Sequence, residues 1–422
     1  MAGSSALPST IDDVTGAQSG RIVTLDLIRG VAVLGILAIN IGGFAGPSLS
    51  TLSPELPSAV SRADETAYAL SFLLFEGKMR ALFTLLFGAS TVLLIDRAEE
   101  SGRFGIGVQV RRLAWLALFG LAHFYLLWWG DILFAYAIAG FVALTLVELK
   151  PRTLVIAALA IFTIWHGSGA LLSAPDVLRE NRVLHGTATP AETRAYGELR
   201  QQIEDYARQE TAALSGSFAD QARSRIVGKT FEPFTGAWDA LGETLPLMMI
   251  GMALLRTGFF SGAWRKRTLV AIGLGASVTG LALSGAIIAF VWPRAFPFEA
   301  MESAIRYWTA IPHLVTAIGY ACLLVLIAPR LSGTLPGHWL MNCGRMAFSN
   351  YIGTTVLMTW IFYGWGLGWI ERFGPAWQWA FVLLGWAAMI LFSNLWLGRF
   401  RRGPLEWLWR SLVEGHRLPN LR

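Results

Sequence analysis

Charged residues are scarce in this chain of 422 residues: Asp, Glu, Lys and Arg make up 15% of it, while 54% is hydrophobic. A soluble globular domain usually carries about 25% charged residues, so the composition argues against a soluble protein. Only two cysteines occur, Cys322 and Cys343, both in apolar stretches, which argues against a disulfide framework and a cysteine-based metal site. Walker, dinucleotide-binding and GxSxG motifs are missing, and no two histidines have metal-ligand spacing. No metal site, ATP-driven pump or serine hydrolase is therefore predicted.

Long apolar runs are what the sequence has instead. They recur along the whole chain, each about 20 residues long, which is enough to cross the hydrocarbon core of a bilayer. We predict an all-α fold, a polytopic transmembrane helical bundle of about ten spans that lies in a lipid bilayer. The expected spans are residues 22–44, 68–95, 112–129, 131–149, 153–172, 237–258, 268–292, 306–329, 338–362 and 376–398.

The positive residues predict the orientation of these spans. Lys and Arg gather in the loops after the second, fourth, sixth, eighth and tenth spans and are sparse in the alternate short loops. Because cytoplasmic loops carry an excess of Lys and Arg, both termini are expected in the cytoplasm. The net charge of +6 then has a topological explanation, and no nucleic-acid partner is predicted.

The spans divide the chain into five expected regions. They are a disordered cytoplasmic tail (1–20), an N-terminal five-span region (21–172), an extracytoplasmic loop (173–235), a C-terminal five-span region (236–400), and a cytoplasmic interfacial helix with a tail (401–422). In the loop, Thr189, Pro190 and Glu192 have the spacing of a capping box. Apolar residues follow them at helical intervals, which predicts an amphipathic helix over the membrane face.

The first span carries three polar side chains that a helix in lipid keeps only for a reason: Asp26, Arg29 and Asn40. Arg29 and Asn40 differ by only about 20° around the helix, and Asp26 lies on a neighbouring row. All three share one stripe, with Asn40 roughly 16 Å beyond Arg29. Two interpretations stay open. Asp26 and Arg29 form an interfacial ion pair while Asn40 caps the outer end of the helix, or the stripe faces a polar cavity inside the bundle.

The second expected span also contains charge, in "FEGKMRALFTLLFGAS". Glu76, Lys78 and Arg80 interrupt an otherwise apolar stretch, and Glu76 and Arg80 have the i, i+4 spacing of helical ion pairs. Gly77 lies between them and predicts either a broken helix or a helix that begins at the membrane interface.

Two more spans bring polar candidates. His123 lies within an apolar run, and Asp131 sits at the tight outer turn that follows. A buried histidine is more often a hydrogen-bonded packing residue, but its titration near neutral pH makes His123 the best general-base candidate of the chain. The ninth span contains Arg345 and Ser349 at i, i+4, with Asn350 adjacent, and an arginine on a membrane span predicts a functional site.

The polar motifs also carry a resemblance. "RIVTLDLIRGVAVLGILAIN", "FEGKMRALFTLLFGAS", "AHFYLLWWGDILFAYA" and "GRMAFSNYIGTTVLMTWIFYGWGLGW" with "GPLEWLWRSL" resemble the YeiB-like family of bacterial inner (cytoplasmic) membrane proteins. The resemblance covers nearly the whole chain and includes that family's C-terminal domain of unknown function. Leu25-Asp26-x-x-Arg29-Gly30 is also similar to the first helix of transmembrane acyltransferases such as heparan-alpha-glucosaminide N-acetyltransferase.

The second resemblance implies a reaction, in which an acyl group passes from cytoplasmic acyl-CoA to an extracytoplasmic sugar or other small acceptor. It implies that Asp26 and Arg29 hold the donor, and His123, Asp131 and Asn40 would be the catalytic residues. The wider set of candidate donor-binding residues is Asp26, Arg29, Glu76, Arg80, Arg345, Ser349 and Asn350. The chain departs from the O-acyltransferases at Asn40, where they keep a catalytic histidine, and an amide cannot act as a base.

Two other functions stay open. In a transporter, Arg29, Arg80 and Arg345 would select a small organic anion, and Glu76 or His123 would relay protons. In a non-catalytic membrane protein, the polar residues would bind a lipid or a partner. Acyl transfer ranks first because of the shared motif in the first helix, and acyl-CoA is the one donor substrate that it implies.

Overall fold

The computed structural model describes residues 22–56 and 60–422, and these ranges contain helices but no β-strand. The predicted all-α polytopic bundle is confirmed. The expected disordered tail, residues 1–20, lies outside the described residues.

In the described ranges, eight helical segments are long and apolar enough to cross a membrane. They are α2 (Val23–Ala45), α3 with α4 (Arg62–Leu74 and Lys78–Glu100), α5 with η2 (Gly105–Ala122 and His123–Leu127), α7 (Pro151–Leu184), α10 (Glu232–Arg256), α11 with η4 (Lys266–Val291 and Trp292–Arg294), α13 (Ala310–Leu331) and α16 (Pro375–Arg399). The other two expected spans are shorter helices. One is α6 (Leu133–Leu144), and the other is divided into α14 (Leu335–Arg345) and α15 (Ala347–Phe362).

The second span is broken at Gly77, which is the first of the two forms expected there. Gly77 has φ +66°, a left-handed conformation that glycine adopts without steric cost. A Cβ at this position would also lie 1.7 Å from Nδ1 of His313, so the ring of His313 closes directly over the break. The break places Glu76 and Lys78 inside the bundle rather than along one continuous helix.

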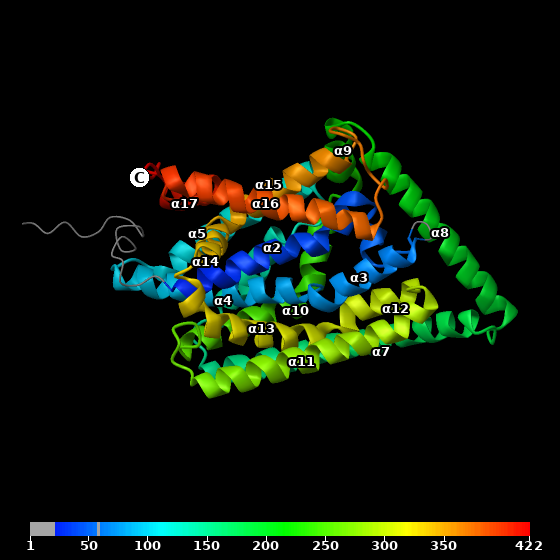
Figure 1. The fold of residues 1–422 in the computed structure, drawn as a ribbon, viewed down its shortest axis with the longest axis horizontal. Coiled ribbons are helices and arrows are strands. Elements are labelled where there is room, and N and C mark those ends of the chain that lie inside the picture. Colours follow the sequence, from blue (N-terminus) through cyan, green and yellow to red (C-terminus); the bar gives the residue numbers. More distant parts are fainter. Residues whose placement is uncertain (1–21, 57–59) are drawn as a thin grey trace, which may run out of the picture.

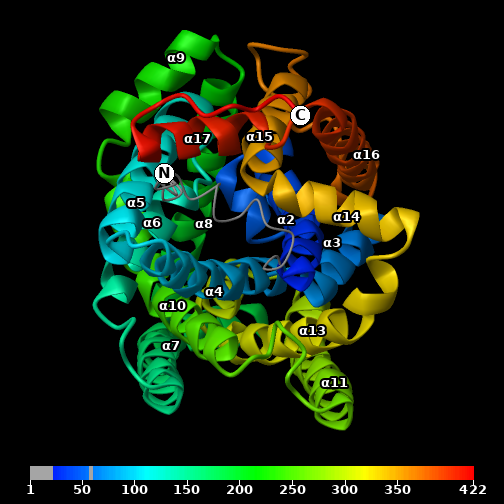
Figure 2. The same cartoon turned by 90° about the vertical axis from the view of Figure 1, so that its left-hand side faces the viewer.

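α2 is the central helix of the bundle. It packs against α4, α13, α14, α15 and α16, and Figure 2 shows it surrounded by them. Most of its length is buried, including Ile28, Ala32 and Leu37. A helix that is apolar on nearly all sides is expected at such a position. Whatever polar groups α2 carries therefore face other helices.

The two ends of the bundle differ. α8 (Pro190–Leu214) crosses one end, and α17 (Pro404–Glu414) lies at the opposite end (Figure 1). The predicted capping box of Thr189 and Glu192 is present at the start of α8. Short elements complete the chain: η1 (Ser48–Thr51), α9 (Phe218–Arg223), η3 (Ser224–Gly228), α12 (Phe298–Ser303) and η5 (Ala304–Trp308). The orientation of the bundle in the membrane stays a prediction from the positive residues.

Candidate functional site

The polar stripe of α2 begins with an ion pair. Nη1 of Arg29 lies 3.3 Å from Oδ1 of Asp26, and Nη2 donates to the hydroxyl of Ser90 on α4 at 3.0 Å. Both charged side chains are largely covered, with 24% and 13% of their surface exposed. The expected pairing is therefore present, and α4 supplies a third polar group to it.

Asn40 lies further along the same stripe. Gly43 and Phe44 lie within about 60° of Asn40 around the helix, and both contact Trp128. Nε1 of Trp128 donates to the carbonyl of Gly43 at 3.2 Å, and its ring lies 4.1 Å from that of Phe44. Asn40 thus faces the side of α2 on which η2 lies, and no hydrogen bond to its amide occurs within residues 22–56 and 60–422.

His123 begins η2, a single π-helical turn at the end of α5, and both nitrogens of its ring are engaged. Nδ1 lies 2.9 Å from Oδ1 of Asp131, and Nε2 lies 3.0 Å from the hydroxyl of Thr355 on α15. A carboxylate only accepts hydrogen bonds, so it favours the tautomer with the proton on Nδ1. Nε2 is then the acceptor that a general base needs. His123, Asp131 and Thr355 are all buried or nearly so.

A second polar stripe on α5 runs parallel to the one on α2. Arg112 and His123 are eleven residues apart, as are Arg29 and Asn40, and eleven residues span about 16 Å of helix. Both helices pack on α4, and Arg29 is close enough to Arg112 for their charges to interact. The two arginines therefore lie at one end of the stripes, and Asn40 and His123 lie toward the other.

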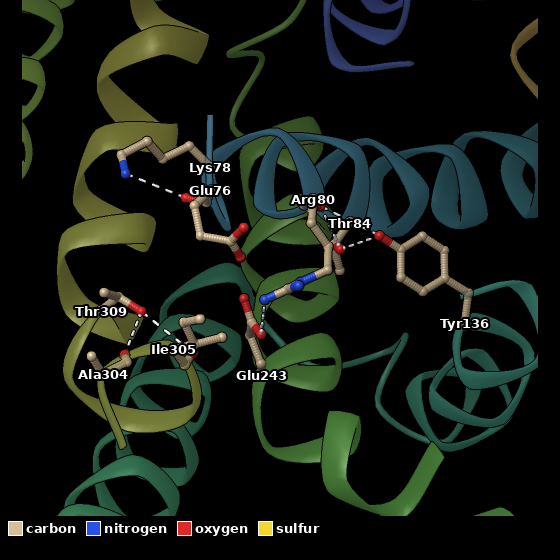
Figure 3. A network of polar contacts seen from close by, with 9 residues as sticks. All are labelled: Glu76, Lys78, Arg80, Thr84, Tyr136, Glu243, Ala304, Ile305 and Thr309. Carbon is tan, nitrogen blue, oxygen red and sulfur yellow. Dashed lines mark hydrogen bonds and ion pairs between the residues drawn. The ribbon is translucent and has the colours of Figure 1, made fainter. Parts of the chain in front are cut away.

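A separate charged network lies between α4, α10, α6 and η5 (Figure 3). Nη2 of Arg80 lies 3.0 Å from Oε2 of Glu243 on α10, and the carboxylate of Glu76 points toward this pair. The expected partner of Arg80 was Glu76, but the direct ion pair is made with Glu243. The ammonium of Lys78 is fully buried and donates to the backbone carbonyls of Phe72 and Glu76 at 3.1 and 3.3 Å.

The candidates of the ninth span do not share one helical face, because the helix breaks between α14 and α15. Arg345 donates to Asn342 at 3.2 Å and to the carbonyl of Arg401 at 3.0 Å. The carboxylate of Glu406 on α17 accepts the backbone N–H groups of Phe348 and Ser349 at 2.8 and 3.0 Å. These contacts satisfy the free N–H groups at the start of α15.

Asn350 and Ser349 use their side chains inside the protein as well. Nδ2 of Asn350 donates to Ser393 at 2.9 Å and to the carbonyl of Cys343 at 3.2 Å. The hydroxyl of Ser349 donates to Glu406 and accepts the N–H of Leu405 at 3.0 Å. The geometry gives both residues a part in joining α14, α15, α16 and α17.

A cavity of about 500 Å³ opens on another face of α2. Its α2 lining includes Ala38, Ile41, Gly42 and Ala45, which lie about 100–200° from Asn40 around the helix. Its charged lining residues are Asp64, Glu76 and Glu371, and its described walls contain no Lys, Arg or His. Such walls suit an uncharged or cationic ligand rather than an organic anion. Of the site candidates only Glu76 lines this cavity.

Sequence reasoning missed Glu243, Thr355 and Arg112. Glu243 and Thr355 could not be linked to their partners from the sequence, because Arg80 and His123 are 163 and 232 residues away in the chain. The eleven-residue spacing of Arg112 and His123 was the one signal available. Among the described residues, no three His, Cys, Asp or Glu side chains are grouped so that they could hold a metal ion.

Known proteins match this chain over nearly its whole length. Residues 254–416 match a family model described as "Protein of unknown function (DUF418)". "Uncharacterized protein YeiB" of Escherichia coli is 32% identical over 396 residues, covering 93% of this chain and 96% of that protein. "Uncharacterized protein YxaH" of Bacillus subtilis is 30% identical over 414 residues, covering 93% and 94%. No solved structure matches.

Proposed function

Because this chain belongs to the YeiB-like family and its described residues form eight helical segments long and apolar enough to cross a membrane, we propose that it transfers an acyl group across the bilayer. The donor is cytoplasmic acyl-CoA, and the acceptor is a small hydroxyl- or amine-bearing molecule on the far side. The membrane in question is the inner membrane of a bacterium. The catalytic half is the N-terminal region, residues 21–172, and residues 236–400 support it.

The observation that carries the proposal is the placement of His123 between Asp131 and Thr355. The imidazole has a carboxylate on Nδ1 and a hydroxyl on Nε2, which is the donor–acceptor order that a general base oriented by a carboxylate needs. That arrangement fixes the tautomer and leaves a basic lone pair on Nε2. Arg29 and Arg112 lie at the other end of the same two stripes, about 16 Å along the helices from Asn40 and His123. Their positive charge gives the anionic donor a place to bind.

The roles of the residues follow from their chemistry. His123 would take the proton from the attacking group of the acceptor as that group bonds to the thioester carbon, and would return it to the sulfur of coenzyme A as the C–S bond breaks. Asp131 would stabilise the imidazolium that forms in between. Thr355 occupies Nε2 in this structure, so its hydroxyl would either turn aside or pass the proton on. The amide of Asn40 cannot act as a base, but its N–H groups can donate to the thioester carbonyl oxygen as negative charge develops there. Asn40 would thus polarise the carbonyl.

Transport of an organic anion is the alternative, and the contacts of its candidate residues favour it less. Arg80 is paired with Glu243, and Arg345 donates to Asn342 and to a backbone carbonyl. The cavity of about 500 Å³ presents carboxylates to its ligand. Anion selectivity would need positive charge in that position.

The test uses the purified protein in proteoliposomes with radiolabelled acetyl-CoA on the cytoplasmic side and a panel of sugars and amines on the other. We expect labelled acceptor to form, and His123→Gln to slow its formation by about 10²- to 10⁴-fold. His166→Gln is the control, because His166 is also buried but, among the described residues, forms a hydrogen bond only with the carbonyl of Phe162 in its own helix. A His123→Gln variant with the wild-type rate overturns the proposal. Uptake of an anion driven by a pH gradient, without acyl transfer, would favour the transporter.

A further inference from the structure

Arg112 of α5 is held against an aromatic ring at the α17 end of the bundle. Its guanidinium lies 4.5 Å from the centre of the Trp409 ring, and Nε1 of Trp409 donates to the carbonyl of Arg112 at 3.0 Å. The ring of Trp409 also packs edge-on against Phe348. α17 thus fixes the position of Arg112 through two contacts, and neither contact neutralises its charge.

Two other arginines lie near enough to Arg112 for their charges to act on it. Arg29 of α2 and Arg410 of α17 both interact electrostatically with Arg112. Like charges that are partly withdrawn from water repel one another, so Arg29 and Arg410 make a negative group beside Arg112 more favourable. Three helices bring these arginines together, so their convergence is a property of the fold rather than of one sequence segment.

The carboxylates nearby have other partners. Asp26 pairs with Arg29, and Glu406 accepts backbone N–H groups at the start of α15. Glu414 receives two hydrogen bonds from Arg103, both at 3.0 Å. In the part of the chain that the structure describes, no carboxylate lies within ion-pair distance of Arg112.

One turn of α5 before Arg112 lies a buried hydrogen-bond acceptor that has no partner in the part of the chain that the structure describes. Gln109 precedes Arg112 by three residues, which places the two side chains on the same side of α5. Gln109 is only 3% exposed, and its Nε2 donates to Thr91 at 3.1 Å, next to the Ser90 that bonds Arg29. Its Oε1 has no hydrogen-bond partner among the described residues. Buried amide oxygens are usually paired, so a donor from a ligand is the missing element.

We propose that Arg112, Arg29, Arg410 and Gln109 form a binding site for a phosphate or pyrophosphate group whose carrier also donates an N–H or O–H to Gln109. Guanidinium groups bind phosphate through paired, charge-assisted hydrogen bonds. Two sources offer this chemistry: the pyrophosphate of coenzyme A in solution, or the phosphodiester headgroup of an anionic lipid. The choice of coenzyme A rests on the proposed function, whereas the phosphate site does not.

The test is calorimetry on the full chain in nanodiscs of phosphatidylcholine, with coenzyme A and inorganic pyrophosphate as probes. Arg112→Gln should weaken binding of both probes at least tenfold. Arg111→Gln is the matched control, because it removes the same charge from the neighbouring exposed position and should change affinity less than twofold. Arg410→Gln, at an exposed position of α17, is the second variant should Arg112→Gln fold poorly, and it should weaken binding about threefold.

A second set of nanodiscs containing phosphatidylglycerol separates the two sources. If the headgroup is the ligand, phosphatidylglycerol will compete with pyrophosphate and weaken its binding to the wild type. The Arg112→Gln variant will no longer show this effect of the lipid. If coenzyme A is the ligand, its affinity will be the same in both lipids. Equal effects of Arg111→Gln and Arg112→Gln, or no binding of any probe, overturn the site. Coenzyme A binding without acyl transfer would leave this site in place while refuting the proposed function.

Discussion

Oδ1 of Asp131 lies 2.9 Å from Nδ1 of His123, and Oδ2 of the same carboxylate accepts the backbone N–H of Phe134 at 2.8 Å. Asp131 therefore has two tasks: it orients the imidazole and it satisfies a free N–H group at the start of α6. Because α6 cannot shift without moving Asp131, the position of the imidazole is tied to the packing of α6 against α5.

Asp131→Asn separates these two tasks. Asparagine is also a good cap, so α6 should keep its start and the unfolding temperature should change little. The amide no longer selects the tautomer with the proton on Nδ1, so the rate of acyl transfer should fall by about 10²- to 10⁴-fold. Rate and unfolding temperature are measured on the same preparation. A wild-type rate in Asp131→Asn would show that Asp131 is only a cap.

The pair of Arg80 and Glu243 gives a prediction about stability. Glu243→Gln would remove the direct ion-pair partner of the Arg80 guanidinium and leave only the more distant Glu76, which costs about 3 kcal/mol at the lower end of the range for buried pairs. The lower end applies because 34% of the Arg80 side chain is exposed. Thermal unfolding in detergent measures the loss.

The control for this prediction is the exposed pair of Arg62 and Glu65. Their charged atoms are 2.8 Å apart, but 78% of the Arg62 side chain is exposed. Arg62→Gln should therefore cost less than about 1 kcal/mol. The double substitution Arg80→Met with Glu243→Leu should recover most of the loss. Equal losses in Glu243→Gln and Arg62→Gln would contradict the view that the network around Arg80 stabilises the bundle.

The sequence alone predicted the local features of this fold well. The ion pair of Asp26 and Arg29, the capping box of Thr189 and Glu192, and the break at Gly77 all depend on residues within four positions of one another. Such patterns follow from helical geometry and from the conformational range of glycine. The class of the fold followed from the apolar runs in the same way.

The long-range partners could not be predicted in this way. An apolar run predicts that a helix crosses the membrane, but it does not say which other helix it faces. The start of α15 is an example: residues 338–362 read as one span, yet the chain breaks before Ala347 and Glu406 of α17 accepts the exposed N–H groups. Arg112 lies at the start of the expected span 112–129, and only the fold shows that Trp409 covers it.

Gly77 and Gly102 allow the steric effect at the break to be isolated. Both have positive φ, +66° and +75°, but a Cβ at Gly77 would meet the His313 ring, whereas nothing lies within 4 Å of one at Gly102. Gly102→Ala should cost only the backbone penalty, about 1 kcal/mol. Gly77→Ala should cost about 3 kcal/mol, since it adds a collision in a packed interior. Thermal unfolding compares them, and equal losses would mean that His313 does not close over the break.

Glu299 of α12 gives a prediction about pH. Burial raises the pKa of its carboxyl from 4.5 to about 6, and the nearby carboxylates of Asp176 and Glu180 add to the effect. The folded protein therefore binds this proton more tightly than the unfolded chain does. The stability that Glu299 contributes is fully present below pH 4.5 and is lost as the pH rises through about 6.

Glu299→Gln should remove this part of the pH dependence. The variant should be more stable than the wild type at pH 7 and nearly equal to it below pH 4.5. The gain should be about 1–2 kcal/mol, because the Glu299 side chain is only 16% exposed and its carboxylate is weakly screened by water. Glu192→Gln is the control: Arg182 and the capping box lower the pKa of Glu192 to about 2, so this carboxylate stays ionised between pH 5 and pH 8. Its unfolding temperatures should run parallel to those of the wild type over that range. If the unfolding temperatures of Glu299→Gln also run parallel to those of the wild type, the carboxyl of Glu299 does not titrate between pH 5 and pH 8. The ion pairs of Arg179 with Asp176 and Glu299 then relieve the repulsion between the carboxylates of α7 and α12.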